Sequence, residues 1–245
     1  MALKKRTLVN SLTRDLPAGE PVTLAWLNSR KISSQGAYYY VKAGWLERLA
    51  SGVFVRPGAP VDLVASLRLL VEKGYLHHVG GKTALAWWGF QHNVSPNVET
   101  LMLFGHRGKK LPPWFLQRFP ARVVVRALFD EPADTPMFVG NNDSYRGVPV
   151  SDPERAALEM LNAVPQHQGL EEAEHLMQGL VSLRVDVLRS LLKVCRSVKA
   201  VRLFLHFAKS LELPCASALA VDQFPVGSKS RYVRKLSSGT LIIKP

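Results

Sequence analysis

The sequence predicts an α+β protein that begins with a winged helix-turn-helix and continues into a larger, mixed α+β domain. Three short helical patterns followed by an alternating two-stranded ribbon are typical of the first part. The turn-rich stretch Arg56–Pro60 then interrupts the chain. Beyond it, β-rich segments precede a long helical pattern, so we expect domains at residues 1–58 and 59–245.

Capping residues and apolar spacing define the three N-terminal helices. Leucines at four-residue spacing predict a first helix over Leu3–Leu16. Thr23 is suited to cap a second helix over Leu24–Ser29, because a hydroxyl at this position accepts a hydrogen bond from a free N–H of the first turn. Ser33 or Ser34 is expected to cap a third helix in the same way.

A two-stranded ribbon is expected after the third helix. Gly44 ends that helix, since glycine readily takes the left-handed conformation found at helix C-termini. The segments Trp45–Leu49 and Val53–Arg56 alternate in polarity, and Ala50–Gly52 forms the turn between them. Three helices and a hairpin together make a winged helix-turn-helix.

The chain after the turn-rich stretch is expected to combine helices with a small mixed sheet. An apolar helix is predicted over Val61–Glu72 and another near Thr83–Trp88. The expected strands lie in Thr100–Phe104, Arg122–Leu128 and Met137–Val139. The second domain is therefore predicted to be α+β.

Helices are expected to dominate the last hundred residues. Asp152 is predicted to cap a helix that runs to Leu161. The pattern over Leu170–Leu211 is helical throughout, with breaks near residues 179–183 and 194–199. A hairpin over Arg231–Lys244 closes the chain.

Basic side chains are in strong excess over acidic ones. The 245 residues include 32 Lys and Arg against 19 Asp and Glu, which gives a formal net charge of +13 and a pI near 10.0. Nucleic acid and anionic membrane surfaces are the partners that such a charge favours. No apolar run reaches the roughly twenty residues of a membrane span, so we expect no association with a bilayer interior.

Two features predict a cytoplasmic protein. Asn10, Arg14 and Asp15 interrupt the N-terminus before a secretory apolar stretch develops. Cys195 and Cys215 are the only cysteines and do not form a C-x-x-C pair, which favours two buried thiols in a reducing compartment.

Polar residues of the third helix and the ribbon are suited to contact DNA. A winged helix places its third helix in the major groove, where Gln pairs with adenine and hydroxyls and cations reach bases or phosphates. The alternative is that the tyrosines are core residues and the helix contacts protein, but the local positive charge favours DNA. The expected contacts are Ser33, Ser34, Gln35, Tyr38, Tyr39, Lys42, Arg48 and Arg56.

Two further groups of cations are expected to contact phosphates. The first is the N-terminal group Lys4, Lys5 and Arg6. The second lies in the C-terminal helical region, where residues 178–211 are almost free of Asp, and its alternative role is an ordinary solvated helix face. The expected contacts of this region are Arg189, Lys193, Arg196, Lys199 and Arg202.

The sequence lacks the familiar catalytic motifs. It has no phosphate-binding loop, dinucleotide fingerprint, nucleophile elbow or zinc-protease motif, and its histidines and cysteines lack metal-ligand spacing. We therefore expect no metal, no other cofactor and no enzymatic activity. The enzyme alternative is a metal-dependent nuclease, whose chemistry would use Glu99, Asp130, Glu131 and Lys109 or Lys110.

Seven segments spread along nearly the whole chain carry a further signal. They are Tyr40–Leu49, Gly52–Gly58, His78–Leu85, Thr100–Phe104, Leu111–Trp114, Pro153–Leu161 and Val198–Leu205. Together these segments resemble the AbiEi antitoxin family of type IV toxin–antitoxin systems. The combination of N-terminal and C-terminal segments is more specific than either group alone.

The resemblance implies a bacterial repressor of its own toxin–antitoxin operon that binds inverted repeats in promoter DNA. It implies that the C-terminal domain is needed for antitoxin activity against a nucleotidyltransferase-like toxin, without a stable complex between the two. The family's N-terminal motif maps onto residues 33–56, and no catalytic role maps onto the chain. A stand-alone transcription factor and an antitoxin that binds its toxin directly are the alternatives.

Overall fold

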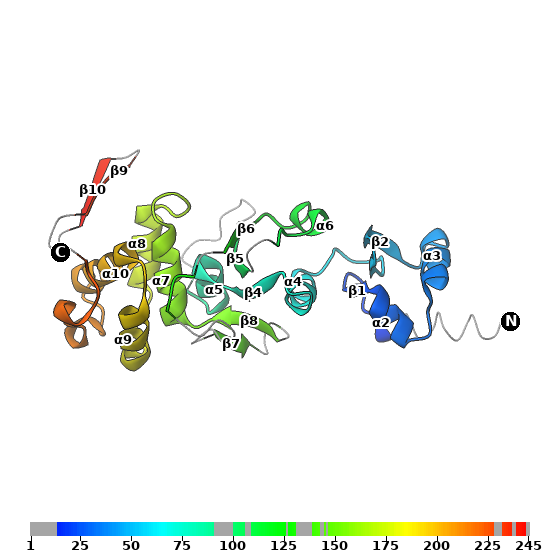
Figure 1. Cartoon of the computed structure of the whole chain (residues 1–245), viewed down its shortest axis with the longest axis horizontal. Helices are drawn as coiled ribbons and strands as arrows, with labels where there is room; N and C mark the ends of the chain where they lie inside the picture. Colours follow the sequence, from blue (N-terminus) through cyan, green and yellow to red (C-terminus); the bar gives the residue numbers. More distant parts are fainter. Residues whose placement is uncertain are drawn as a thin grey trace. The chain divides into compact units, whose positions relative to one another are not determined.

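The chain divides into two compact units in a computed structural model (Figure 1). The N-terminal unit comprises Met1–Leu76, Lys109–Pro120 and Asp143–Val148, and the C-terminal unit comprises His77–Gly108, Ala121–Asn142 and Pro149–Pro245. The structure describes residues 14–90, 100–105, 109–125, 127–130, 139–142, 145, 147–227, 232–236 and 239–243. The expected first helix, Leu3–Leu16, lies almost wholly outside these residues.

The predicted second and third helices are confirmed as α2, Leu24–Ser29, and α3, Ser34–Lys42. The hydroxyl of Thr23 accepts a hydrogen bond from the backbone N–H of Trp26 at 3.2 Å. The hydroxyl of Ser33 caps α3 in the same way, also at 3.2 Å. Of the two serines that the sequence offered for this role, the first therefore acts as the cap.

A three-stranded antiparallel sheet completes this part of the N-terminal unit. The predicted ribbon is present as β2, Glu47–Ala50, and β3, Val53–Val55, and Gly52 between them has a φ of 71°. The sequence did not predict β1, Pro21–Thr23, which pairs with β3 on the side opposite β2. A three-residue strand is too short to show alternation, so only its pairing partner reveals it.

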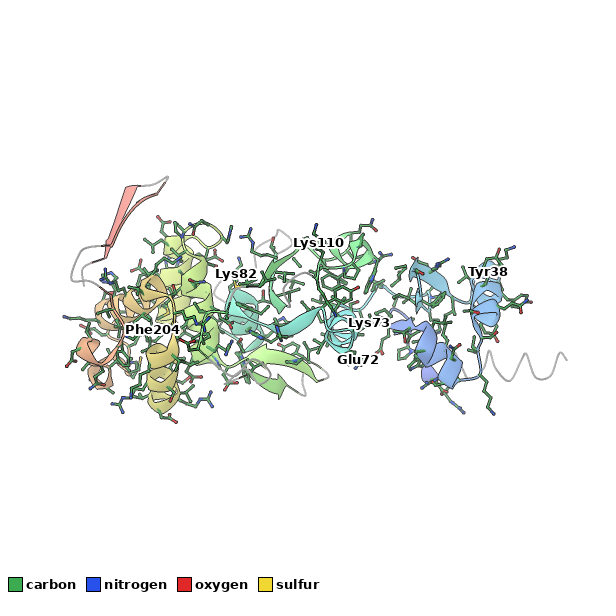
Figure 2. The ribbon with its side chains drawn as sticks, in the orientation of Figure 1. Tyr38, Glu72, Lys73, Lys82, Lys110 and Phe204 are labelled. Atoms are coloured by element: carbon green, nitrogen blue, oxygen red, sulfur yellow. The ribbon has the colours of Figure 1, made fainter. Side chains whose placement is uncertain are left out.

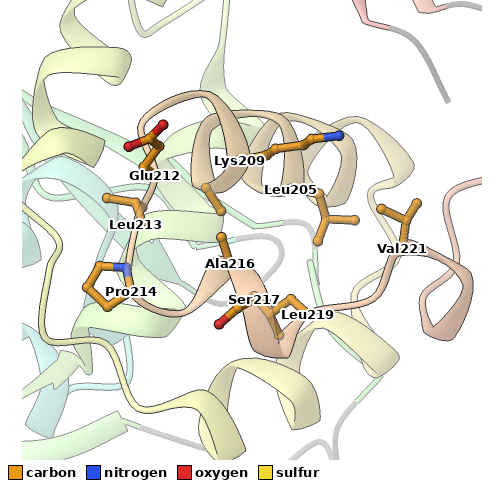
Figure 3. Close-up of a pocket in the computed structure, with 10 residues that line it drawn as sticks. Leu205, Lys209, Glu212, Leu213, Pro214, Ala216, Ser217, Leu219 and Val221 are labelled. Atoms are coloured by element: carbon orange, nitrogen blue, oxygen red, sulfur yellow. The ribbon is translucent and has the colours of Figure 1, made fainter.

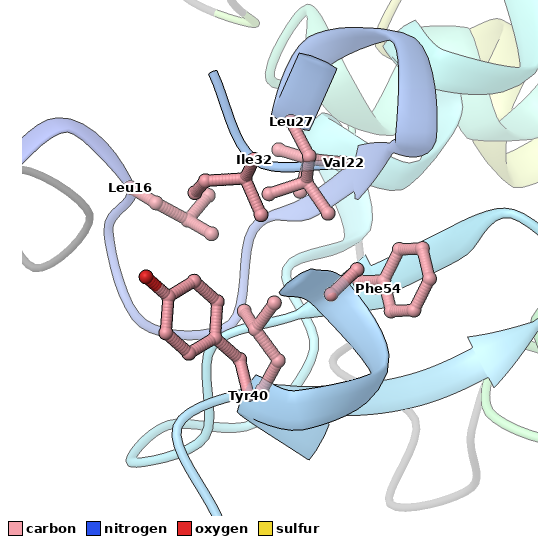
Figure 4. Close-up of a cluster of buried hydrophobic side chains, with 8 residues drawn as sticks. Leu16, Val22, Leu27, Ile32, Tyr40 and Phe54 are labelled. Atoms are coloured by element: carbon pink, nitrogen blue, oxygen red, sulfur yellow. The ribbon is translucent and has the colours of Figure 1, made fainter. Parts of the chain in front are cut away.

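A compact apolar core holds these helices to the sheet (Figure 4). Its buried members are Leu16, Val22, Leu27, Ile32, Ala37, Tyr40, Leu46 and Phe54. Ala37 and Tyr40 are the contributions of α3, one helical turn apart. One face of α3 is thereby fixed against the core, and its opposite face points away from it.

Two later helices also belong to the N-terminal unit. The helix α4, Leu63–Glu72, begins two residues later than expected, because the carboxylate of Asp62 caps it by accepting the N–H of Ala65 at 2.6 Å. The short helix α6, Pro113–Leu116, buries Trp114 and Phe115.

A five-stranded sheet forms the centre of the C-terminal unit, with almost all of its residues in that unit. Its order is β6, Ala121–Val124; β5, Leu101–Gly105; β4, Leu76–Val79; β8, Val148–Ser151; and β7, Val139–Asn142. The pairs β5–β6 and β4–β8 are parallel. The strands β4 and β8 were not predicted, and most of the expected strand Met137–Val139 lies outside the described residues.

Five α-helices accompany this sheet in the described part of the C-terminal unit. They are α5, Gly81–Trp87; α7, Pro153–Ala163; α8, Leu170–Gln178; α9, Val185–Val194; and α10, Val198–Ser210. Both expected breaks are confirmed, since α8, α9 and α10 are separate, and α5 and α10 both pack on α7 (Figure 1). The predicted closing hairpin is also present, as β9, Tyr232–Leu236, and β10, Gly239–Ile243. Among the described residues, no helix is long and apolar enough to cross a membrane.

Asp152 is the N-cap residue of α7, as predicted, and the helix extends two residues beyond Leu161. This residue precedes α7, but its side chain accepts no capping hydrogen bond. Its carboxylate instead binds Arg184 at 2.5 Å, and the same guanidinium binds Glu154 at 2.8 Å. Burial on its own raises the pKa of Glu154, but the hydrogen bonds from Arg184 outweigh it and hold that pKa below its ordinary value. The Asp152 carboxylate therefore forms a long-range ion pair instead of the local capping hydrogen bond that is usual at this position.

The state of the two cysteines follows from their burial. Cys195 and Cys215 are free and buried, as expected, and burial raises the pKa of the Cys195 thiol to about 11.

A cavity near the end of α10 has a volume of about 550 Å³ and is lined mainly by apolar side chains, including Leu205, Leu213 and Val221 (Figure 3). Lys209, Glu212 and Ser217 are the polar members of its lining.

Candidate nucleic-acid interface

The outer face of α3 gathers the polar residues that the sequence singled out. Ser33, at the cap, and Ser34, Gln35 and Lys42 are all exposed. Tyr38 and Tyr39 are 59% and 52% exposed, and Tyr38 is labelled on α3 in Figure 2. The alternative that all three tyrosines are core residues holds only for Tyr40, which is 6% exposed.

The helical spacing gives this face the length of two turns. Gln35, Tyr39 and Lys42 recur at intervals of four and three residues, so they lie along one side of the helix. The ammonium group of Lys42 lies 4.9 Å from the centre of the Tyr38 ring, which orients the cation along the same face. A donor and acceptor amide, two phenols and a cation are thus presented together.

The two arginines predicted on the ribbon have different environments. Arg48, on β2, is exposed, and its Nε donates a hydrogen bond to the carbonyl of Ala50 at 3.3 Å. Arg56 is half-buried, and its Nε donates to the carbonyl of Leu16 at 2.6 Å. Arg48 is therefore accessible to a binding partner. Arg56 instead holds the segment around Leu16 next to the end of β3.

The surface formed by α2, α3 and the ribbon is almost free of acidic side chains. Glu47 is the only carboxylate between Glu20 and Asp62 in the sequence. Arg30, Lys31, Lys42 and Arg48 lie in the same interval. Such an imbalance attracts a polyanion and repels a basic surface.

The cations predicted on the C-terminal helices do not form one exposed stripe. On α9, Arg189 and Lys193 are exposed, and Arg189 donates a hydrogen bond to the carbonyl of Ala218 at 2.8 Å. Arg196, between α9 and α10, is exposed and forms an ion pair with Asp130, with Nε 2.9 Å from Oδ1. The hydrogen bond from Arg196 lowers the pKa of Asp130.

Lys199 and Arg202 point into the protein, contrary to the expected stripe. The Nζ of Lys199 donates hydrogen bonds to the carbonyls of Asn162 and Val164, at 2.6 and 2.5 Å. Arg202 is 5% exposed and donates from Nε to the carbonyl of Val226 at 2.6 Å. Both cations satisfy backbone carbonyls, a role that their spacing in the sequence does not reveal.

The remaining predicted residues are only partly described. The N-terminal cations Lys4, Lys5 and Arg6 lie outside the described residues, as do the nuclease candidates Glu99 and Glu131. Of the other nuclease candidates, Lys110 is exposed, Asp130 is paired with Arg196, and Lys109 donates to the carbonyl of Lys73 at 3.2 Å. Within the described part of the chain, no three metal-ligating side chains form a cluster.

Comparison with known protein families accounts for nearly the whole chain. Residues 98–244 match the family described as "Transcriptional regulator, AbiEi antitoxin, Type IV TA system". Residues 5–96 match the corresponding "AbiEi antitoxin N-terminal domain". The chain belongs to the AbiEi antitoxin family. It is thus a member of a family of transcriptional regulators from type IV toxin–antitoxin systems, as the sequence resemblance implied.

A solved structure resembles this chain over most of its length. It is the crystal structure of the RV2827C protein from Mycobacterium tuberculosis, with a TM-score of 0.58 and 16% identity. The likeness covers 92% of this chain and 86% of that one, and at this identity it shows the fold alone. A search among curated proteins found no match.

The C-terminal unit also contains a buried polar cluster that sequence reasoning missed. The carboxylate of Glu159, on α7, is fully enclosed and accepts four hydrogen bonds. His78 Nε2 and Arg155 Nε lie 3.0 and 2.9 Å from Oε1, and the Gly81 N–H and the Ser151 hydroxyl lie 3.0 and 2.9 Å from Oε2. The cluster joins β4, α5, β8 and α7. Its members lie in or beside two of the AbiEi-like segments, 78–85 and 153–161, which is the only signal that marked them.

The cluster predicts how stability depends on pH. Burial alone raises the pKa of Glu159, but the charge and hydrogen bond of His78, the charge of Arg155 and the N–H of Gly81 together hold it below its ordinary value. A lowered pKa in the folded chain gives stability that is complete above the ordinary value of about 4.3 and is lost as the pH falls through the folded-state pKa.

We therefore expect the difference in unfolding free energy between the wild type and Glu159→Gln to be largest at neutral pH and to shrink below about pH 4. Urea unfolding at a series of pH values measures this difference. A difference that stays constant from neutral pH to pH 3 would show that the charge of the carboxylate is not what the cluster recognises.

Proposed function

We propose that this chain is a sequence-specific DNA-binding repressor of its own operon and the antitoxin of a type IV system. In this proposal residues 1–58 form a winged helix-turn-helix, and residues 59–245 form the antitoxin domain. The operator is an inverted repeat in the promoter, bound as double-stranded DNA in the cytoplasm. The toxin is a nucleotidyltransferase-like protein that the antitoxin counters without a stable complex.

The outer face of α3 is the observation that carries the proposal. Ala37 and Tyr40 fix the helix to the core, so Gln35, Tyr38 and Lys42 are held on a rigid surface rather than on a loop. An α-helix fits the major groove of B-DNA, where a Gln amide distinguishes adenine from the other bases. Arg48 on the adjacent ribbon is suited to bind the phosphate backbone, which sets the orientation of the helix but not its sequence preference.

Fluorescence anisotropy with the purified chain tests this proposal. The probes are the DNA upstream of its own gene and a scrambled duplex of equal length, each at two salt concentrations. We expect a preference of about a hundredfold or more for the upstream DNA that persists at the higher salt. Equal affinities that fall together with salt would mean that the charge of +13 acts only as a non-specific attractor.

Substitutions within this interface separate base recognition from phosphate binding. Gln35→Ala and Tyr39→Ala are expected to lower the ratio of operator to scrambled-DNA affinity by about 5- to 150-fold, because base contacts contribute about 1–3 kcal/mol each. Arg48→Ala is expected to weaken both affinities by a similar factor and to reduce the salt slope by about one. An equal loss of both affinities in Gln35→Ala would remove this residue from base recognition.

The C-terminal helices provide the proposed second phosphate-binding surface. Arg189, Lys193 and Arg196 are its exposed members, whereas Lys199 and Arg202 are bound to backbone carbonyls. If this surface contacts DNA, Lys193→Gln lowers the salt slope by about one, as Arg48→Ala does. Co-expression with the toxin tests the antitoxin role, and recovery of a toxin complex at high salt would contradict the absence of a stable complex.

A further inference from the structure

The single carboxylate of the proposed DNA-binding surface has a partner from a distant part of the sequence. Glu47 lies on β2, immediately before Arg48. Its Oε1 is 3.4 Å from the guanidinium of Arg118, which follows α6 and is 71 residues away in the sequence. Both residues belong to the N-terminal unit, so this contact lies within one compact body.

The position of the Arg118 side chain is defined by two contacts. Besides the contact with Glu47, its NH1 donates a hydrogen bond to the carbonyl of Trp114 at 3.0 Å, and the Trp114 side chain is buried. These two contacts use two of the five N–H groups of the guanidinium. The hydrogen bond to the Trp114 carbonyl therefore holds the guanidinium in place next to the ribbon. Its remaining N–H groups can donate to another acceptor.

The ion pair has little value for the stability of the fold. The side chains of Arg118 and Glu47 are 32% and 56% exposed, and ion pairs at such positions typically contribute less than about 1 kcal/mol. For a polyanion at the ribbon the pair matters more, because an uncompensated Glu47 carboxylate on β2 would repel nearby phosphates. The contact removes this repulsion.

We propose that Arg118 is part of the DNA-contacting surface, where it neutralises Glu47 and donates its remaining N–H groups to a backbone phosphate at the ribbon. This inference rests on the proposed DNA-binding function. It extends the interface beyond the helices and ribbon of residues 1–58 to the segment that follows α6. The role is in affinity rather than in base discrimination, because phosphate contacts carry no sequence information directly.

A double-mutant cycle in the full-length chain tests the proposal. Affinities for the upstream and scrambled duplexes are measured over a range of salt concentrations for Arg118→Gln, Glu47→Gln and the double variant. Lys82→Gln is the matched control, since it removes the same charge from an ion pair in the C-terminal unit, where Lys82 lies 3.2 Å from Glu172. Circular dichroism confirms that each variant is folded.

We expect Arg118→Gln to weaken binding to both duplexes by about tenfold and to lower the salt slope by about one. Glu47→Gln is expected to tighten binding by about threefold, because it removes a repulsive charge. In the Glu47→Gln background, Arg118→Gln still weakens binding and still lowers the slope. Lys82→Gln has a clearly smaller effect on both quantities.

Two results would overturn the proposal. If Arg118→Gln has no effect in the Glu47→Gln background, Arg118 acts only on Glu47 and contacts no phosphate. If Arg118→Gln and Lys82→Gln weaken binding equally, the effect is one of overall charge. A wild-type chain that does not bind DNA would instead refute the proposed function, and this outcome is distinct from the other two.

Discussion

Replacing Glu159 with alanine is expected to lower the free energy of unfolding by about 3–5 kcal/mol, the range seen when one partner of a buried ion pair is removed. The variant leaves Arg155 and His78, which are 6% and 3% exposed, facing an empty space where a carboxylate was. It also removes the acceptor of the Gly81 N–H and the Ser151 hydroxyl. Burial removes the hydrogen bonds that such donors form with water, and without an acceptor no hydrogen bond within the protein replaces them.

Urea unfolding followed by circular dichroism measures this effect, and two variants calibrate it. Ser151→Ala removes one neutral donor from the cluster and is expected to cost about 1 kcal/mol. Glu171→Ala removes an exposed carboxylate from the first turn of α8 and is expected to cost less than about 1 kcal/mol. If Glu159→Ala and Glu171→Ala were equally stable, the cluster would not hold the C-terminal unit together.

Substitution of Gly81 by alanine is expected to lower the unfolding free energy by about 2–5 kcal/mol. Gly81 has a φ of 53°, and this left-handed conformation costs a residue with a Cβ about 1–2 kcal/mol. A Cβ at this position would also lie 1.9 Å from the sulfur of Met102 on β5, so the buried Met102 side chain, the strand or the helix must move. Overpacking of this kind typically adds about 1–3 kcal/mol.

Gly89→Ala separates the two contributions. Gly89 also has a positive φ, of 87°, but a Cβ there meets no atom within 4 Å. We therefore expect this control to show the backbone strain alone, about 1–2 kcal/mol, in the same unfolding experiment. Equal losses for the two variants would mean that contact with Met102 contributes nothing. A larger loss for Gly81→Ala would show that the close approach of α5 to β5 requires glycine.

Local chemistry in the sequence determined much of the N-terminal unit. The hydroxyls of Thr23 and Ser33 satisfy N–H groups only three residues away, and Gly52 permits the turn that its neighbours require. Interactions over such short separations are present in the sequence pattern itself. The exposed face of α3 followed in the same way, from the spacing of Gln35 and Tyr39.

Only the tertiary structure determined which side chains of a helical sequence pattern are exposed to solvent. The sequence pattern predicts the same exposed position for Lys193, Lys199 and Arg202. In the structure Lys193 is exposed, whereas Lys199 and Arg202 bind backbone carbonyls at least 24 residues away. Helical periodicity indicates a face but does not indicate what covers it.

The same reason explains the features that the sequence analysis missed. The strand β1 exists because β3 pairs with it, Glu159 meets His78 across 81 residues, and Arg118 meets Glu47 across 71. These contacts join segments whose local patterns contain no trace of the partner. Helices, caps and turns were therefore determined by the sequence read locally, whereas the buried cluster and the charge balance of the proposed interface were decided by the fold.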